Sequence, residues 1–546
     1  MTLIRGGTIV DGTGKPAFEG DILVEGDSIK EIAPAAVRLP PSPSPSSSPS
    51  TSTSTSPSLS PSPSPSTIET IDATGCLVTP GFIDAHTHSD AYLILEPDAP
   101  SKITQGITTE LNGQCGGSVA PRYGEARLSS DWAALLGERL TWRSLAEYRT
   151  VLEAAHPAVN TVQFVGHNTL RSSVVGYAGR ATTAAELKRM EYLLAESLDE
   201  GGYGFTTGLV YQPGKYSTTA EVVALAKVAA AKGAFYATHM RSESDRILEA
   251  IDEVLALVRA TGIRAEISHL KTSGRKNWSK IDAVLEKLDA AVAQGELLGS
   301  DRYPFCAAGT DLDIVFSDWA GEGGAPYEMQ RLEDSALRAK IIAELNASER
   351  DWSTVMIGGT WHPDNRRYGG KTVAEILAAE KPGVTVGEFL CELLAKDGCK
   401  TGAFFFGMSE ENLAKIYSRP WVVPGSDASL RAPWGPLGAD HPHPRAYATM
   451  PEFYRRVRAL GFSREATIAR MTSVPARRFE LKGRGELVRG AFADLVVWKE
   501  DEFKMRSTYT EPHQFTGGVK LVMVNGVVPY RDGRFTGHRA GRLLTR

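Results

Sequence analysis

The chain has few cysteines, no excess of basic charge and no long apolar run, and each shortage excludes a class of protein. Five of its 546 residues are cysteine, an odd and scattered set that does not predict a disulfide framework and favours a reducing compartment. Its 65 acidic residues outnumber its 60 Lys and Arg residues, and no basic patch is evident, so nucleic-acid binding is not indicated. No apolar stretch approaches membrane-spanning length, and the N-terminus lacks a signal-peptide layout. We therefore expect a cytoplasmic protein that binds neither nucleic acid nor a membrane.

What is present is an ordinary globular composition with one unusual segment. The chain is 42% hydrophobic and 23% charged, enough for a large core and more than one domain. Residues 38–67, however, are almost only Ser, Pro and Thr. Such a segment cannot bury enough apolar surface to offset the entropy of ordering, so we expect it to be disordered. It interrupts two strand-like stretches, which predicts an expanded surface loop.

Both ends of the chain alternate apolar and polar residues around glycine-containing turns. This pattern covers residues 1–76, apart from the Ser/Pro segment, and residues 484–546. Period-2 alternation is typical of half-buried antiparallel strands. We expect the two ends to pack together as one small β-sandwich domain.

Residues 77–483 follow a different pattern, in which short apolar runs alternate with helical stretches. Alternating strands and helices predict βαβ units and a parallel sheet. Eight candidate strand ends occur, the number that a (β/α)8 TIM-type barrel needs. They are His88, "NGQCGG", "TVQFVGH", "GYGFTTG", "GAFYATH", "GIRAEISH", "LLGSDRYP" and "WVVPGSD". A further run, "GAFFFGM", leaves the strand count open by one.

Histidines and acids gather at these strand ends. His86 and His88 are two residues apart on the first strand, His239 and His269 end the fifth and sixth strands, and Asp427 ends the eighth. Active sites of this barrel lie at the carboxyl ends of its strands, so these side chains should meet. Imidazoles with a carboxylate suit a divalent metal such as zinc.

Several motifs together resemble the D-aminoacylase (N-acyl-D-amino-acid deacylase) group of the amidohydrolase superfamily. The resemblance covers nearly the whole chain outside the Ser/Pro segment. It rests on "TPGFIDAHTHSD", "QGITTELNGQCGGS", "GLVYQPGKY", "THMRSES", "SHLKTSG", "DRYPF", "GSDAS" and "HPRAYATMP". It implies zinc-dependent hydrolysis of the amide bond of a small-molecule substrate, an N-acyl-D-amino acid, to a carboxylate and a free D-amino acid.

The resemblance also implies a ligand set. Cys115, whose thiolate zinc binds well, would hold the tighter ion with His239 and His269. His86, His88 and Asp427 would face a second, weaker site. Asp427 would also act as general base, taking the proton of a metal-activated water and returning it to the leaving amine.

Substrate contacts are implied in the same way. Lys271, Tyr303 and Arg445 would hold the α-carboxylate, while Tyr211 and Val210 would line the side-chain wall. A Trp- and Gly-rich insertion near residues 311–371 would form a lid. We expect neutral, mostly apolar substrate side chains. The group usually has a serine near the carboxylate where this chain has Gly309, which leaves substrate identity less well defined than mechanism.

Two other functions remain open. One is a cyclic-amide hydrolase of the hydantoinase or dihydroorotase kind, whose relatives bridge two metals with a carboxylated lysine at the end of the fourth strand. Here "GYGFTTG" has no lysine there, and Cys115 is present instead. The other is a non-enzymatic scaffold, which would be expected to lose metal ligands that this chain retains.

Overall fold

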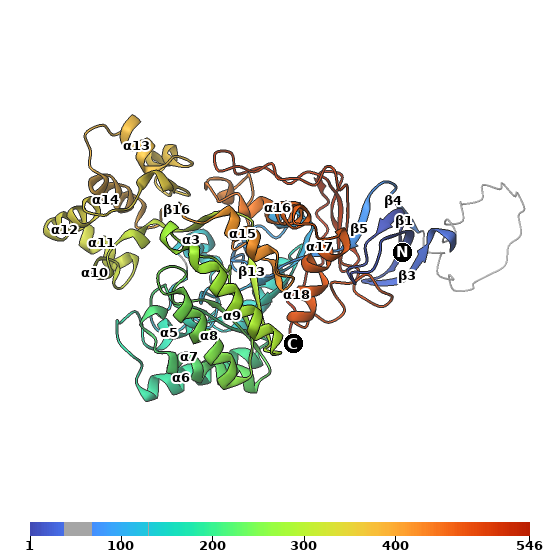
Figure 1. Cartoon of the computed structure of the whole chain (residues 1–546), viewed down its shortest axis with the longest axis horizontal. Helices are drawn as coiled ribbons and strands as arrows, with labels where there is room; N and C mark the ends of the chain where they lie inside the picture. The colour runs from blue at the N-terminus through green and yellow to red at the C-terminus, as the bar shows by residue number, and fades with distance from the viewer. Residues whose placement is uncertain (38–67, 129) are drawn as a thin grey trace, which may run out of the picture.

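The computed structural model describes residues 1–37, 68–128 and 130–546. Figure 1 shows a sheet at the end that holds the N-terminus, a central barrel ringed by helices, and a mostly helical lobe at the opposite end. The predicted disorder of residues 38–67 lies outside the described residues. In the part that is described, no helix has both the length and the apolar character needed to cross a membrane.

Eight parallel strands form a closed barrel, which confirms the predicted fold. Parallel pairing joins β6 to β8 in one sheet and β9 to β17 in another. Backbone hydrogen bonds close the ring, from Phe164 N to Asn112 O (3.0 Å) and from Ala85 N to Pro424 O (3.1 Å). The strands are β6 (Phe82–Asp84), β7 (Ile107–Asn112), β8 (Asn160–Gln163) continued by β9 (Val165–Gly166), β10 (Gly204–Gly208), β11 (Phe235–His239), β12 (Arg264–Ile267), β13 (Leu298–Arg302) and β17 (Val422–Pro424).

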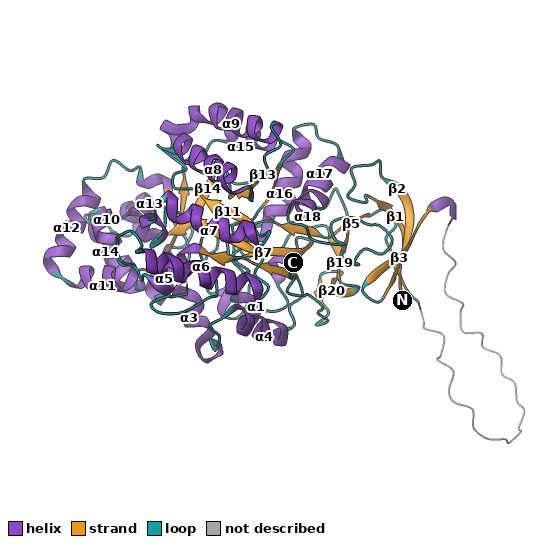
Figure 2. Cartoon of the chain, turned by 90° about the horizontal axis from the view of Figure 1, so that it is seen from below, coloured by secondary structure: helices purple, strands orange, loops and turns teal. Residues whose placement is uncertain are grey.

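Amphipathic helices cover the outside of the barrel (Figure 2). The helix α8 (Ile247–Thr261) shows why: it buries Ile247, Ile251, Val254 and Val258, which recur at helical spacing on one face. It ends at Gly262, whose φ of 67° is the left-handed conformation that terminates many helices. The other main helices are α4 (Leu145–Ala155), α5 (His167–Val174), α6 (Ala184–Asp199), α7 (Thr219–Ala231), α9 (Ile281–Ala293), α15 (Glu410–Tyr417), α16 (Arg445–Ala459), α17 (Arg464–Met471) and α18 (Ser473–Arg478). Shorter helices are α1 (Tyr92–Leu95), α2 (Pro100–Ile103) and α3 (Ser130–Leu136).

The two chain ends form one β-structure, as the alternating patterns predict. Hydrogen bonds link nine strands into a single sheet in the order β21-β20-β19-β18-β5-β1-β2-β3, with β4 paired to β1. Because β5 pairs with both β1 and β18, the N-terminal part extends past the predicted boundary at residue 76. The strands are β1 (Thr2–Ile9), β2 (Phe18–Glu25), β3 (Ser28–Pro34), β4 (Glu69–Asp72), β5 (Leu77–Pro80), β18 (Leu495–Trp498), β19 (Val519–Val524), β20 (Val527–Arg531) and β21 (Arg534–Phe535).

An insertion between β13 and β17 forms the lobe, and it is longer than the predicted 311–371. Its buried apolar residues form a core of their own, which runs from Leu312 to Ala403. The run "GAFFFGM" belongs here, as the central strand β16 of a three-stranded antiparallel sheet, and not to the barrel. The elements are β14 (Ala307–Asp311), α10 (Asp318–Gly321), α11 (Ala325–Glu333), α12 (Ser335–Asn346), β15 (Val355–Ile357), α13 (Val373–Ala379), α14 (Val386–Asp397) and β16 (Gly402–Phe406).

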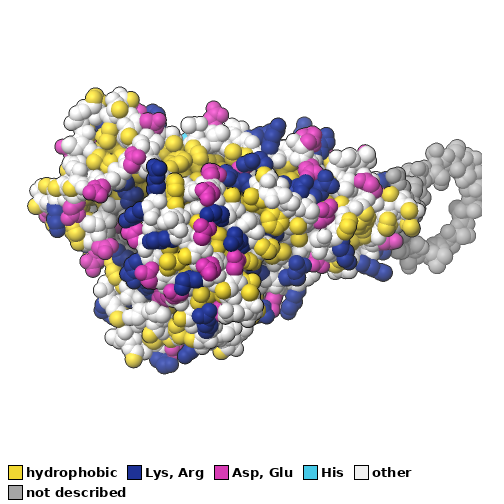
Figure 3. Space-filling model, viewed as in Figure 1, with side chains coloured by type: hydrophobic (Ala, Val, Ile, Leu, Met, Phe, Trp, Pro, Cys, Tyr) yellow, Lys and Arg dark blue, Asp and Glu magenta, His cyan; other side chains and the backbone are white. Residues whose placement is uncertain are grey.

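The surface shows no area dominated by basic charge on the face seen in Figure 3. Acidic and basic side chains alternate there over the barrel and the lobe. This face therefore lacks the continuous basic surface that would track a nucleic-acid backbone.

Candidate metal centre and pocket

The thiol of Cys115 lies at the centre of a histidine cluster. Its Sγ is 3.4 Å from His86 Nε2, 3.4 Å from His269 Nε2 and 3.7 Å from His239 Nδ1. These four residues follow or end the strands β6, β7, β11 and β12, so the barrel brings together side chains that are up to 183 positions apart along the chain. The side chains that were predicted to meet at the strand ends therefore lie close together.

The backbone is strained at this centre. Cys115, His269 and Asp427 have φ values of 50°, 38° and 50°, in the left-handed region that residues other than glycine rarely adopt. Such strain costs of order 1–3 kcal/mol per residue and clusters at functional sites.

The end of β10 explains why the fourth strand carries no lysine. Gly208 is its last residue, and a Cβ added there would lie 2.0 Å from the carbonyl oxygen of Cys115. The loop that presents Cys115 therefore occupies the space that a strand-four side chain would need. In this structure, the loop that presents Cys115 leaves no room for a lysine side chain at the end of β10.

Asp427 joins the cluster from the eighth strand. Its Oδ1 lies 3.3 Å from His86 Nε2 and 3.1 Å from His88 Nε2, and its Oδ2 accepts a hydrogen bond of 2.7 Å from Arg445 Nη1. Ligand atoms of His86, Cys115, His269 and Asp427 all lie within 4.8 Å of one another, a spacing that one metal ion could bridge. Within the cluster, His88 is the most open histidine, with a quarter of its side chain exposed.

Glu243 was not predicted as a site residue, yet it contacts both His239 and His269. Its Oε2 lies 3.4 Å from His239 Nε2, while its Oε1 lies 2.9 Å from His269 Nδ1 and accepts a 2.6 Å hydrogen bond from Lys271 Nζ. Both imidazoles therefore present one nitrogen to Glu243 and the other to Cys115. The signal in the sequence was the position of Glu243, four residues after His239 in "THMRSES".

Asp301 is a second acid that was missed. Its Oδ2 lies 3.2 Å from His86 Nδ1, and its Oδ1 accepts a 2.9 Å hydrogen bond from the backbone N of His269. It is almost fully buried, at the carboxyl end of β13. It fixes the ring of His86 so that Nε2 faces Cys115 and Asp427.

The electrostatics of the cluster favour a cation at its centre. Burial opposes ionisation of Cys115, yet His86 and His269 hold the pKa of its thiol well below the ordinary value. Burial likewise opposes ionisation of Asp427, but Arg445 and then His269 keep the pKa of that carboxyl well below its usual range. For His86, burial is outweighed by Asp301 and Cys115, which raise its pKa. A thiolate and carboxylates packed among imidazoles are the donor set of a zinc site.

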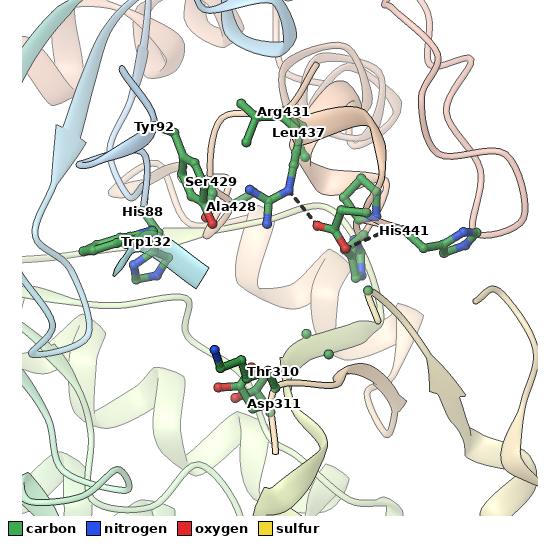
Figure 4. A pocket seen from close by; sticks show the side chains of 18 of the residues that line it. His88, Tyr92, Trp132, Thr310, Asp311, Ala428, Ser429, Arg431, Leu437 and His441 are labelled. Atoms are coloured by element: carbon green, nitrogen blue, oxygen red, sulfur yellow. Dashed lines mark hydrogen bonds and ion pairs between the residues drawn. The ribbon is translucent and has the colours of Figure 1, made fainter. Parts of the chain in front are cut away.

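A cavity of about 640 Å³ opens above the cluster. Cys115, His88 and Asp427 line it, and so do the predicted substrate residues Tyr211 and Arg445. In Figure 4, His88 and Trp132 lie on one side of the cavity, and Thr310 and Asp311 of the insertion lie on the other. The cavity is thus enclosed jointly by the barrel and the insertion.

The other three predicted substrate residues do not line this cavity. Lys271 is nearly buried against Glu243, and its Nζ also lies 2.7 Å from His269 Nδ1. Tyr303 is fully buried beside Arg445, whose guanidinium carbon is 4.7 Å from the phenol ring centre. Val210 is partly buried next to Tyr211, outside the lining.

Comparisons with known proteins agree with this architecture. The model of the "Amidohydrolase family" matches residues 69–360. An N-acyl-D-glutamate deacylase of Alcaligenes xylosoxydans xylosoxydans is 33% identical over 100% of this chain and 96% of its own length. A D-aminoacylase of the same organism is 32% identical over 100% of this chain and 97% of its own length.

A solved structure extends the likeness to three dimensions. The N-acyl-D-glutamate deacylase of Bordetella bronchiseptica, complexed with zinc and a phosphonate inhibitor that mimics the tetrahedral intermediate, superposes with a TM-score of 0.80 at 31% identity. The match covers 100% of this chain and 99% of the other. A match of this extent leaves no major part of the fold unaccounted for. The chain belongs to the amidohydrolase family, within its D-aminoacylase group.

Proposed function

We propose that this protein is a zinc-dependent deacylase of N-acyl-D-amino acids. The observation that carries the proposal is the Cys115 thiol within 3.7 Å of three imidazoles, beside Asp427 at the floor of a cavity. The relatives support the same reaction, since those compared are deacylases of D-amino acids and one was crystallised with zinc. The preference for the D-enantiomer rests on these relatives.

The ligand chemistry suggests how zinc would be held. Cys115 Sγ, His239 Nδ1 and His269 Nε2 would form the tighter site, because Glu243 engages the opposite nitrogen of each ring. His86, His88 and Asp427 would form a weaker second site, with Cys115 shared between them. Zinc bound there supplies a water of lowered pKa and polarises the amide carbonyl.

Asp427 is the general base in this proposal. It takes one proton from the attacking water and delivers it to the amine nitrogen as the carbon–nitrogen bond breaks, which leaves a carboxylate and a free D-amino acid. Arg445 holds Oδ2 of Asp427 at 2.7 Å, so Oδ1 remains directed at the metal centre. Burial keeps bulk water from competing with this proton transfer.

The α-carboxylate of the substrate would bind beside Arg445. Arg445 lines the cavity, and among the described residues its Nε is a buried polar atom without a hydrogen-bond partner. Unpaired buried donors are costly, and an incoming carboxylate would satisfy them. Lys271, by contrast, is engaged by Glu243, so we assign it to the support of the metal ligands.

We assign Glu243 the same supporting role, because it faces both His239 and His269. Glu243→Gln keeps the shape of the side chain but replaces one acceptor oxygen by an NH2 donor. We expect zinc affinity to fall about 10- to 100-fold, as it does when other partners of metal ligands are replaced. Zinc titration with a competing chelator measures this directly. Asp245→Asn, an exposed acid two residues away, should bind zinc normally. If Glu243→Gln binds zinc as tightly as the wild type does, Glu243 does not support the metal ligands.

A substrate panel tests the proposed function as a whole. Purified protein with quantified zinc would be assayed on N-acetyl-D-amino acids, their L-enantiomers and a hydantoin. We expect hydrolysis of D-substrates, weak or no hydrolysis of L-substrates and none of the hydantoin. Hydantoin turnover above that of every linear amide would favour the cyclic-amide hydrolase, and zinc-loaded protein without turnover would favour the scaffold.

The proposed cytoplasmic location is supported by the five cysteines, all of them free.

A further inference from the structure

A loop of the nine-stranded sheet reaches the wall of the cavity. It comprises residues 499–518, which connect β18 to β19. Tyr509 of this loop packs against two aromatic side chains of the insertion strand β16, with ring centres 5.9 Å from Phe404 and 4.9 Å from Phe406. The carbonyl oxygen of Tyr509 accepts a 2.7 Å hydrogen bond from His441 Nε2, and His441 lines the cavity (Figure 4). The sheet formed by the chain ends is therefore in contact with both the insertion and the cavity lining.

The same loop holds the segment in which α16 begins. His513 of the loop donates from Nε2 to the carbonyl oxygen of Asp440 at 2.8 Å. Its Nδ1 accepts a 2.9 Å hydrogen bond from the hydroxyl of Tyr447. Residues 440–447 are therefore held at both ends by a single side chain of the loop. Arg445 lies within this segment, as the first residue of α16.

His443 connects Tyr509 to Arg445. The backbone N–H of Arg445 donates to His443 Nδ1 at 3.0 Å. On the other side of the ring, His443 Nε2 lies 3.2 Å from the Tyr509 hydroxyl and 3.1 Å from the carbonyl oxygen of Ala307. A backbone N–H can only donate, so Nδ1 carries no proton. Burial and the neighbouring Arg445 lower the pKa of His443 well below its ordinary value, so the ring is neutral and its one proton lies on Nε2, toward Tyr509 and Ala307.

These hydrogen bonds fix the point from which the Arg445 side chain starts. The first N–H groups of a helix have no partner within the helix, and His443 supplies one at the start of α16. The His443 ring is buried and meets the Tyr509 ring edge to face, with centres 4.9 Å apart. At the far end of its side chain, Arg445 pairs with Asp427 and, among the described residues, leaves Nε without a partner. A shift of the backbone at Arg445 would therefore move Nε relative to a bound substrate.

We propose that Tyr509 and His443 are positioning residues for Arg445, so that a loop of the nine-stranded sheet sets how tightly the α-carboxylate of the substrate is bound. The inference rests on the proposed function and deepens it, because Arg445 is the group that would meet this carboxylate. Residues behind a site hold its binding groups in place, and even a small displacement of such a group weakens its contacts. The pair of Arg445 with Asp427 should persist, since opposite buried charges hold it. The effect should therefore appear in substrate binding more than in turnover.

Removal of one hydroxyl tests the link. Tyr509→Phe keeps the packing of the ring and deletes the contact to His443 Nε2. From the usual contribution of one hydrogen bond, we expect KM for an N-acetyl-D-amino acid to rise about three- to tenfold, with kcat within about twofold of wild type. KM for the analogue with a carboxamide in place of the α-carboxylate should stay within about twofold, because it forms no ion pair with Arg445. Tyr530→Phe is the matched control, since Tyr530 lies on β20 of the same sheet, does not line the cavity and should leave both substrates unaffected.

A second substitution shows whether the hydroxyl acts through His443. His443→Asn keeps an acceptor for the backbone N–H of Arg445 but is too short to reach Tyr509. In the His443→Asn background, Tyr509→Phe should change KM by less than about twofold, because the ring that relays its effect is gone. An unchanged KM in Tyr509→Phe, equal losses for acid and carboxamide, or the same Tyr509→Phe effect in both backgrounds would overturn the positioning role and leave the proposed function intact. Absence of wild-type turnover on every N-acetyl-D-amino acid would overturn both.

Discussion

The floor of the cavity and its outer wall are built in opposite ways. The floor is made by barrel strand ends, and its histidines, Cys115 and Asp427 are packed against one another with Asp301 and Glu243 buried behind them. The wall comes from the insertion, which has a core of its own and contributes Thr310, Asp311 and Phe404 to the lining of the cavity. The comparison suggests that the barrel fixes the reaction, while the insertion selects the substrate. Substitutions in the floor should therefore abolish chemistry for all substrates, and substitutions in the wall should change substrate binding while the zinc content stays the same.

The largest effect is expected from Cys115→Ala. The thiol is shared by three imidazoles, so its loss removes the common ligand of both proposed zinc sites. Lewis-acid chemistry is worth several kcal/mol, so activity should fall on the order of 10³-fold or more for every substrate. Metal analysis and circular dichroism would be recorded together. Full zinc content in the folded variant would show that Cys115 is not a ligand.

Asp427→Asn should come next. The amide cannot accept the proton of the attacking water, and general acid–base catalysis is worth about 10²- to 10⁴-fold. Zinc held by Cys115, His239 and His269 should remain, so turnover and zinc content are expected to separate in this variant. Turnover close to wild type would move the base role to His88, the imidazole nearest to the opening.

Arg445 lies where floor and wall meet, and its substitution should cost an intermediate amount. Removing one partner of a buried charge pair typically costs about 2–5 kcal/mol. Because Arg445 also holds Asp427, Arg445→Ala should slow even a substrate whose α-carboxylate is replaced by a carboxamide. The acid substrate should lose more, and the difference isolates the carboxylate contact. Strictly additive losses in kcat/KM would mean that Arg445 serves Asp427 alone.

The barrel and the insertion also differ in how well their structure could be predicted from the sequence. Buried strands alternate with amphipathic helices in a pattern that is local, so the eight strands and the clustering of side chains at their ends were predictable. Lys271 was expected to hold the α-carboxylate of the substrate, but the backbone at His269 is left-handed and the ammonium group of Lys271 donates to Glu243. Glu243 itself lies in an irregular loop, where no periodicity reports which way a side chain points.

The insertion was harder to predict because its signals resemble those of the barrel. The apolar run of β16 could equally have been a barrel strand, since only its antiparallel pairing with β14 and β15 distinguishes it. That ambiguity shortened the predicted lid, which ended at residue 371, whereas the core of the insertion continues to Ala403.

The smallest effect is expected from Gly309→Ser, on the insertion strand β14. Unlike Gly208, Gly309 has room: an added Cβ would lie 3.4 Å from Arg445 Nη2 and 3.6 Å from Phe404 Cδ1, both ordinary contacts. Arg445 already donates to the backbone oxygen of Gly309 at 3.2 Å, so a serine hydroxyl there would lie beside the proposed α-carboxylate site.

One added hydrogen bond contributes about 0.5–1.5 kcal/mol, so kcat/KM should rise by up to roughly tenfold. The rise should be similar for acidic and neutral side chains, because both share the α-carboxylate, and zinc content should not change. Gly309→Ala is the matched control, with the same Cβ and no hydroxyl, and it should stay within about twofold of wild type. A change in the ranking of side chains in Gly309→Ser would place this strand in the side-chain subsite, and a loss of zinc would show that wall and floor are not independent.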